Sequence, residues 1–167
     1  MASISERESG EIEAANASGA TPVVFIHGLW LLPSSWANWA DFFKQAGYAP
    51  LTPDWPDDPE TVEGARAEPE ILAKKTLKQV ADHTTEIINA LDKKPAVMGH
   101  STGGWLAQML AGRGLPAAPV AIARLPEKNW PVGDALHFKT ASSVLCTTTR
   151  PPCTPGPGPI STTGSAA

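Results

Sequence analysis

A serine between two glycines carries the clearest chemical signal in the chain. From Pro95 onward a short apolar run ends in the motif GHSTG at 99–103, and an Ala- and Leu-rich helical pattern begins at once. A strand, a sharp turn and a helix with serine at the tip present a hydroxyl that can attack a carbonyl carbon. The glycines fit because larger side chains there would collide with the neighbouring strand and helix. We therefore expect Ser101 to be a nucleophile.

A second apolar run, upstream of the serine, ends in a loop that can supply hydrogen-bond donors to the reaction at this serine. The stretch 21–30 is rich in β-branched residues and stops at His27-Gly28. Attack on a carbonyl puts negative charge on its oxygen, and each fixed N–H donor stabilises that charge by about 3 kcal/mol. The candidate donors are the backbone amides of Leu29 and Thr102. We interpret His27 as a structural residue that hydrogen-bonds to the loop backbone.

These motifs resemble the N-terminal half of an α/β-hydrolase-fold protein of the esterase, lipase and cofactor-free haloperoxidase kind. The matching segments are VVFIHG at 23–28, the helical pattern at 36–47, YAPLTPD at 48–54 and GHSTGG at 99–104. The resemblance implies a partial α/β-hydrolase fold with about four parallel strands and flanking helices. It implies no cofactor, no metal and a small-molecule acyl substrate. It assigns support of the turn and the loop to His27, Gly28, Gly99, His100 and Gly103.

A serine at the turn also narrows the chemistry that the resemblance implies. Relatives that act on haloalkanes or epoxides use an aspartate, because displacement at an sp3 carbon needs a carboxylate. Ser101 instead implies attack on an ester, thioester, amide or peracid carbonyl, followed by hydrolysis of the acyl-enzyme.

The serine needs an acid and a base to activate it. In the family the acid and then the histidine follow the serine along the chain. Downstream of Ser101 the candidates are Glu127, Asp134 and His137. Asp134 and His137 have the right order but lie three residues apart, whereas family members take them from separate loops. Three interpretations stay open: a hydrolase using this pair, an incomplete remnant or small-molecule-binding module, and a histidine donated by a partner chain.

The chain divides into three parts by composition. Residues 1–20 predict a flexible, disordered arm, 21–123 a partial α/β-hydrolase domain, and 124–167 an irregular tail rich in Pro, Gly, Ser and Thr. Complete family members are longer, and the pattern changes abruptly near Ile122. We therefore predict a truncation or reading-frame change there. A sheet that stops at this point leaves an edge near Val120 unpaired and predicts self-association.

Within the domain, apolar periodicity predicts helices at 35–46 and 74–91, a helix starting near Trp105, and strands near 23–27, 49–52, 95–99 and 118–123. Asp82 and His83 are expected at an exposed or rim position of the second helix. The acidic group after the second strand is expected to face water and bind no metal, because its spacing matches no ligand set. This group consists of Asp54, Asp57, Asp58 and Glu60.

Charge and composition exclude several partners. The 167 residues include 13 Lys and Arg against 17 Asp and Glu, and the basic residues are scattered, which argues against a nucleic-acid partner. The chain has no apolar run of about 18 residues and its beginning lacks the layout of a secretion signal, so we expect no membrane span and a cytoplasmic location. Cys146 and Cys153 are then expected to be free thiols.

Overall fold

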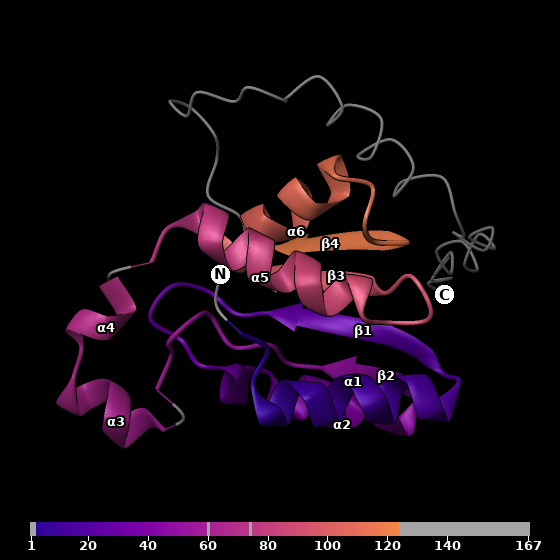
Figure 1. Cartoon of the computed structure of the whole chain (residues 1–167), viewed down its shortest axis with the longest axis horizontal. Helices are drawn as coiled ribbons and strands as arrows, with labels where there is room; N and C mark the ends of the chain where they lie inside the picture. The colour runs from indigo at the N-terminus through magenta and orange to yellow at the C-terminus, as the bar shows by residue number, and fades with distance from the viewer. Residues whose placement is uncertain (1–2, 60, 74, 124–167) are drawn as a thin grey trace, which may run out of the picture.

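Four parallel strands form the centre of the structure, a computed structural model that describes residues 3–59, 61–73 and 75–123 (Figure 1). The strands are β1 (Thr21–Ile26), β2 (Tyr48–Leu51), β3 (Ala96–His100) and β4 (Ala118–Ile122). Their order is β2-β1-β3-β4, and every neighbouring pair is parallel. The predicted α/β class with four parallel strands is confirmed.

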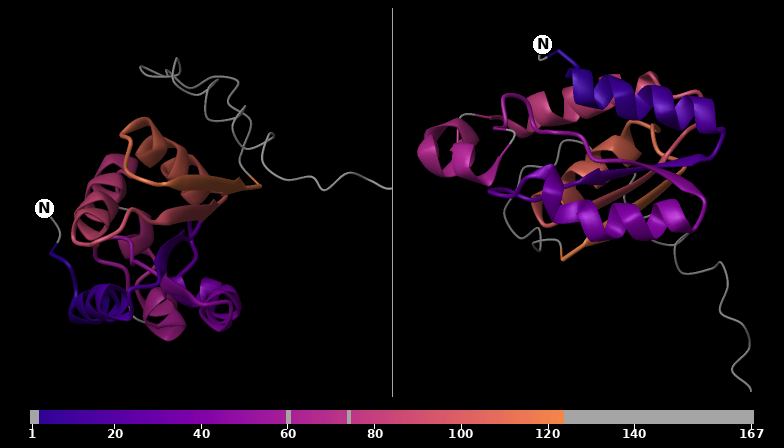
Figure 2. Two further views of the ribbon diagram at one scale, coloured as in Figure 1. Left: turned by 90° about the vertical axis from the view of Figure 1, so that its right-hand side faces the viewer. Right: turned by 90° about the horizontal axis from the view of Figure 1, so that it is seen from below.

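Helices cover both faces of this sheet, as parallel strands require (Figure 2). Helices α1, α5 and α6 pack on one face, and η1 and α2 pack on the other. Helices α3 and α4 lie beyond the carboxyl end of β1 (Figure 1). Their bounds are α1 Glu6–Ser18, η1 Pro33–Trp36, α2 Ala37–Gln45, α3 Val62–Ala67, α4 Glu70–Ala73, α5 Leu77–Asn89 and α6 Thr102–Gly112.

The position of β1 in the centre of the sheet explains why its sequence is a continuous apolar run. Val24 and Ile26 point into the core below α1, α5 and α6, whereas Val23 and Phe25 pack with Trp36 on the α2 face. All four side chains are buried. Since both faces of β1 are covered, alternation of polar and apolar residues is absent from it.

The N-terminal segment is an ordered helix, so the predicted flexible arm is wrong for the residues described. Ser5 caps α1 by a capping box with Glu8, and Gly19 closes the helix with a φ of 63°. Ile12 and Ala15 are buried in the core that also holds Leu51 of β2. Composition indicated disorder because the helix carries few apolar side chains.

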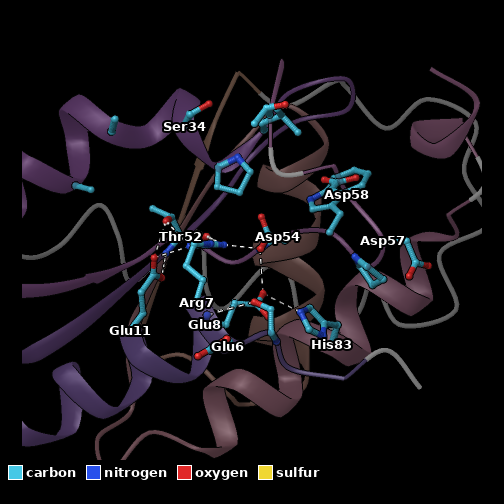
Figure 3. A pocket seen from close by; sticks show the side chains of 18 of the residues that line it. Glu6, Arg7, Glu8, Glu11, Ser34, Thr52, Asp54, Asp57, Asp58 and His83 are labelled. Atoms are coloured by element: carbon cyan, nitrogen blue, oxygen red, sulfur yellow. Dashed lines mark hydrogen bonds and ion pairs between the residues drawn. The ribbon is translucent and has the colours of Figure 1, made fainter. Parts of the chain in front are cut away.

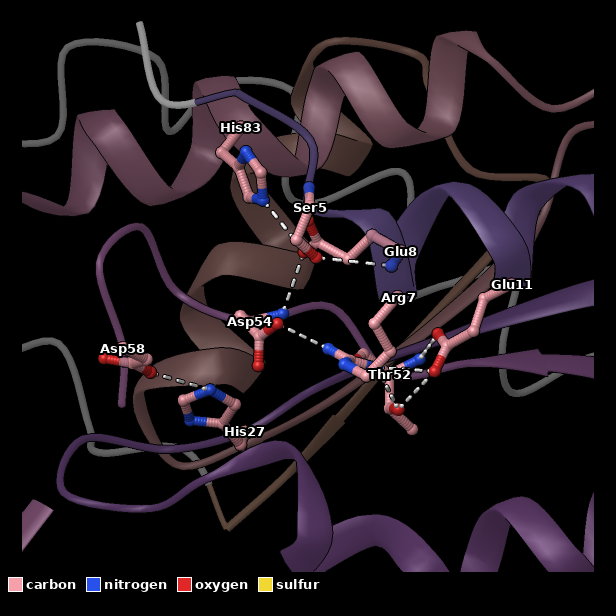
Figure 4. Close-up of polar contacts among 9 residues, drawn as sticks. All are labelled: Ser5, Arg7, Glu8, Glu11, His27, Thr52, Asp54, Asp58 and His83. Carbon is pink, nitrogen blue, oxygen red and sulfur yellow. Dashed lines mark hydrogen bonds and ion pairs between the residues drawn. The ribbon is translucent and has the colours of Figure 1, made fainter. Parts of the chain in front are cut away.

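Polar contacts also attach α1 to the sheet (Figure 4). The guanidinium of Arg7 donates to Asp54 Oδ2 at 2.6 Å and to the Thr52 carbonyl at 2.9 Å. Glu11 Oε2 accepts from the Thr52 amide at 2.8 Å. These contacts join α1 to the segment after β2, and no periodicity in the sequence signals such long-range pairs.

A buried ion pair joins α1 to α5. Glu8 Oε1 lies 2.9 Å from His83 Nε2, and both side chains are 3% exposed. The expected exposed or rim position of His83 is therefore wrong; Asp82 next to it is exposed enough to pair with Lys78 and Arg113. Burial by itself raises the pKa of Glu8, but hydrogen bonds from His83 and the Ser5 amide outweigh it and lower the pKa to about 2.

Several expectations fall outside these observations. Glu60, Asp134, His137, the two cysteines and the whole tail 124–167 lie outside the described residues, and the reading-frame change near Ile122 stays a prediction. In the described sheet β4 is an edge strand, so self-association through it also stays a prediction. None of the helices described has the length and apolarity needed to span a bilayer.

Replacing Glu8 by glutamine should destabilise the fold. At neutral pH we expect Glu8→Gln to lower the free energy of unfolding by about 3 kcal/mol, because it leaves His83 buried without its carboxylate. The folded-state pKa of about 2 lies below the ordinary 4.5, so the Glu8 contribution is complete above pH 4.5 and is lost as pH falls toward 2. Urea unfolding from neutral to acidic pH measures both effects.

The control is Glu6→Gln, an exposed carboxylate in the first turn of the same helix. It should change stability by no more than about 0.5 kcal/mol. Equal effects of the two substitutions would show that the buried pair does not anchor α1.

Candidate functional site

Ser101 occupies the turn between β3 and α6 in a backbone conformation that side chains rarely adopt. Its φ is 55° and its ψ is −118°. The backbone around it is fixed: its N–H donates to the Ile122 carbonyl at 2.9 Å, and its carbonyl accepts from the Gly104 amide at 3.0 Å. Such strain persists only where the surroundings impose it, and it is concentrated at functional sites.

Two glycines make this turn possible because backbone passes where their side chains would be. A Cβ on Gly99 would lie 2.0 Å from the Gly103 carbonyl oxygen, and one on Gly103 would lie 2.1 Å from the Ile26 carbonyl oxygen. Helix α6 therefore starts directly against both β1 and β3. The result is a serine held at the carboxyl end of the two central strands.

The loop after β1 lies against Ser101. A Cβ on Gly28 would come within 3.3 Å of Ser101 Cβ and 3.6 Å of His100 Nδ1. The Gly28 carbonyl accepts from the Leu31 amide at 3.2 Å, which closes a turn, and Trp30 within it has a φ of 65°. The structure thus brings together the serine and the loop that the sequence placed 73 positions apart.

The amides of Leu29 and Thr102 belong to the residues that follow Gly28 and Ser101 in the chain. Thr102 is the first residue of α6, and an N–H in the first turn of a helix has no carbonyl partner within that helix. The positive end of the helix dipole also lies there. Leu29 follows Gly28 directly, so its amide belongs to the peptide group that lies beside Ser101.

A small pocket lies on the α2 face of the sheet, and its lining includes His100, the residue before Ser101, but not Ser101 itself. Its volume is about 270 Å³, close to the lower end of the range for small-molecule sites. Ser101 bonds through its amide to Ile122, one of the lining residues. The lining is mostly apolar and consists of Leu31, Ser35, Trp36, Trp39, His100 and Ile122.

A larger groove of about 1120 Å³ lies between α1, η1 and the segment after β2 (Figure 3). Its walls are acidic, with Glu6, Asp41 and Asp57 among the lining residues. Arg7 reaches into it but is already paired with Asp54 and Glu11. Within the described residues no cluster of three or more His, Cys, Asp or Glu is arranged to hold a metal ion.

The acidic residues after β2 do not all face water, which corrects the expectation for Asp58. Its side chain is 1% exposed and contacts both His27 and Lys75 (Figure 4 shows the His27 contact). Asp57 is exposed, as expected. His27 is buried and its Nδ1 lies 3.0 Å from the Gly28 carbonyl oxygen. No spacing in the sequence indicates the three-residue cluster, because its members come from three separate segments.

The described residues place no hydrogen-bonded acid or base at the Ser101 hydroxyl, although His100 is its neighbour in the chain. Asp134 and His137 lie outside the described residues. In the part of the chain that is described, no side chain hydrogen-bonds to the Ser101 hydroxyl, and both His27 and His83 are buried against partners of their own.

The close approach of α6 to β1 at Gly103 can be tested directly by substitution. We expect Gly103→Ala to destabilise the fold by about 4 kcal/mol or more, because the added methyl group meets the Ile26 carbonyl. Thermal or urea unfolding followed by circular dichroism measures the change.

The matched control is Gly112→Ala at the end of the same helix, where nothing lies within 4 Å of the new Cβ. This control should be neutral or stabilise by up to about 1 kcal/mol. A Gly103→Ala protein as stable as the control would contradict the close packing of α6 on β1.

Comparison with known proteins agrees with this architecture. The sequence profile described as the alpha/beta hydrolase family matches residues 23–160, which includes positions beyond Ile122. No curated protein matches the sequence significantly.

Solved structures show the same fold at low sequence identity. A carboxylesterase of Nitrososphaera gargenis is 20% identical, with 78% of this chain and 47% of that chain covered at a TM-score of 0.54. An extracellular α/β-hydrolase of a Paenibacillus species is also 20% identical, with 74% and 49% covered at 0.53. A thioesterase domain of the curacin pathway is 19% identical, with 80% and 47% covered at 0.53.

The chain thus spans about half the length of these solved structures. The profile match covers most of the sequence. This chain belongs to the alpha/beta hydrolase family.

Proposed function

We propose that this protein is a serine hydrolase that acts on carboxylic ester or related acyl bonds, with Ser101 as nucleophile. The observation that carries the proposal is the strained turn that holds Ser101 directly against the Gly28 loop. A left-handed serine between a buried strand and a helix is costly, and a purely structural turn has no need of it.

The charge that forms during attack would be stabilised by the amides of Leu29 and Thr102. Ser101 Oγ bonds to the carbonyl carbon, and the carbonyl oxygen becomes an oxyanion between these two N–H groups. This assignment is supported by two observations: Gly28, the residue before Leu29, lies against Ser101, and Thr102 begins α6 directly after it. Collapse of the tetrahedral intermediate expels the alcohol, and water then hydrolyses the acyl-enzyme.

The pocket beside the turn supports a short acyl group. Its volume of about 270 Å³ and its apolar lining by Trp36, Trp39 and Ile122 suit a short aliphatic chain rather than a long one. The carboxylesterase and the thioesterase among the structural neighbours act on acyl bonds, which is consistent with this substrate class.

His137 is the proposed general base and Asp134 the proposed acid. In the family pattern the acid and the histidine follow the serine along the chain, and this pair keeps that order. The base would take the Ser101 proton during attack and return it to the leaving alcohol.

A second candidate is a binding module that keeps the pocket without turnover. It is favoured by one observation: no described side chain hydrogen-bonds to the Ser101 hydroxyl. A serine without a base is a poor nucleophile at neutral pH.

A fluorophosphonate probe separates the two candidates. We expect the probe to label the folded protein, since an activated Ser101 oxygen bonds to phosphorus and fluoride leaves. Ser101→Ala should abolish labelling, and Ser34→Ala, which removes an exposed hydroxyl in η1, should leave it intact. Intact-mass spectrometry reads the adduct. Absence of any adduct on folded wild-type protein would favour the binding module.

The base is tested by ester hydrolysis. We expect wild-type protein to hydrolyse p-nitrophenyl acetate and butyrate, and His137→Ala to lower kcat about 10²- to 10⁴-fold. Steady-state rates at several protein concentrations provide the measurement. Unchanged kcat in His137→Ala would refute this assignment, and a specific activity that rises steeply with concentration would indicate a base from a second chain.

A further inference from the structure

Trp30 is an exposed tryptophan in the loop that lies against Ser101. It is 59% exposed, and both of its neighbours, Leu29 and Leu31, are exposed as well. A run of three consecutive apolar residues at the surface is unfavourable unless it serves a function, and exposed apolar groups of this kind mark binding sites. The run begins directly after Gly28, the residue that lies against Ser101.

The backbone at Trp30 has a conformation that bulky residues rarely adopt. Its φ is 65°, and the turn around it is closed by the hydrogen bond from the Leu31 amide to the Gly28 carbonyl. Glycine or asparagine would occupy this position with less strain. Because Trp30 is mostly exposed, its own burial offsets little of this strain. Strain of this kind is concentrated at sites that bind or react.

The ring of Trp30 also differs from the ring of the other exposed tryptophan near the pocket. Trp39 packs its ring against those of Trp36 and Phe43. In the part of the chain that the structure describes, the Trp30 ring contacts no other aromatic ring. It is therefore available to a flat apolar group, which would gain stacking energy there beyond the area that it buries.

The segment after Trp30 separates the two hollows of this surface. Leu31 and Ser35 line the small pocket of about 270 Å³, whereas residues 32–34 line the acidic groove (Figure 3). Trp30 lines neither of them. A substrate that reaches Trp30 therefore does so with the part that stays outside the small pocket. With the proposed short acyl group inside that pocket, the outer part of an ester is its alcohol.

The charge near this segment favours an uncharged alcohol over an anionic one. Glu6, Asp41 and Asp57 line the groove on the other side of residues 32–34. The whole chain carries 17 acidic against 13 basic residues. A leaving group that bears a carboxylate or a phosphate would be repelled by these charges, whereas an uncharged aromatic alcohol would not.

We propose that Trp30 is a specificity-determining residue whose ring binds the uncharged aromatic alcohol of a short-chain ester. This inference rests on the proposed hydrolase function and names the substrate class of the same site. The ring would hold the alcohol equally well in the ground state and in the transition state. It therefore lowers KM and leaves kcat unchanged.

Two acetate esters that share one acyl group test the proposal. Benzyl acetate carries an aromatic alcohol, and methyl acetate carries one that has no ring to stack. We expect wild-type KM to be about 10-fold lower for benzyl acetate, and Trp30→Asn to raise that KM about 5- to 20-fold through loss of one stacked ring. KM for methyl acetate and kcat for both esters should stay within about twofold. Acetate release at constant pH gives the rates.

Three controls separate the ring from other effects. Asparagine tolerates a φ of 65°, so Trp30→Asn removes the ring without adding strain, and Trp30→Phe, which keeps a flat ring, should keep the preference for benzyl acetate. Phe42→Ala removes another exposed aromatic ring, one that lines neither hollow, and should change neither constant. A carboxylate at the para position of benzyl acetate should raise KM, and salt should weaken that effect.

Binding without turnover distinguishes failure of this inference from failure of the hydrolase proposal. Benzyl alcohol, the product, should shift the indole N–H resonance of Trp30, identified as the one missing from the spectrum of Trp30→Asn. An unchanged ester preference in folded Trp30→Asn, or an equal loss in Phe42→Ala, overturns the inference. If wild-type protein hydrolyses neither ester and forms no fluorophosphonate adduct, the hydrolase proposal fails. A shifted Trp30 resonance then still supports a site for aromatic alcohols, and an unshifted one overturns it.

Discussion

The close approach of three backbone segments at Gly99 and Gly103 is the constraint on which the rest of the structure depends. Carbonyl groups of β1 and α6 occupy the space where any side chain would lie, so the helix starts directly against the two central strands. Ser101 is thereby forced to a φ of 55° and the Gly28 loop is brought into contact with it. Packing density at this crossing, rather than any single polar contact, determines where the hydroxyl lies.

Charged groups join several segments of the described domain. The Glu8–His83 pair fastens α1 to α5, and Arg7 with Glu11 fastens it to the segment after β2. Asp58 after β2 contacts Lys75 and lies 3.4 Å from His27 Nε2. Because breaking a buried pair leaves an uncompensated charge, these contacts impose one arrangement on segments that have little apolar surface to bury.

The two faces of the sheet differ in how fully they are covered. Three helices pack on one face, whereas α2 with η1 covers the other, where aromatic side chains remain exposed; Phe42 is 65% exposed. The chain spans about half of the solved structures that share its fold. The small pocket lies on this less covered face and is lined by Trp36, Trp39 and Ile122.

The sequence by itself determined the sheet of four parallel strands and the serine turn, because buried strands and glycine-flanked turns depend on local residue types. The order of the strands came from the structure. It missed α1 and the burial of His83 and Asp58, since those depend on partners 17 to 75 positions away along the chain. Only the tertiary structure decided that Gly28 lies against Ser101 and that His27 lies between Gly28 and Asp58. Polar pairs between distant segments produce no periodic pattern in a sequence. A crowded turn is instead marked by its glycines, and a buried strand by its run of apolar residues.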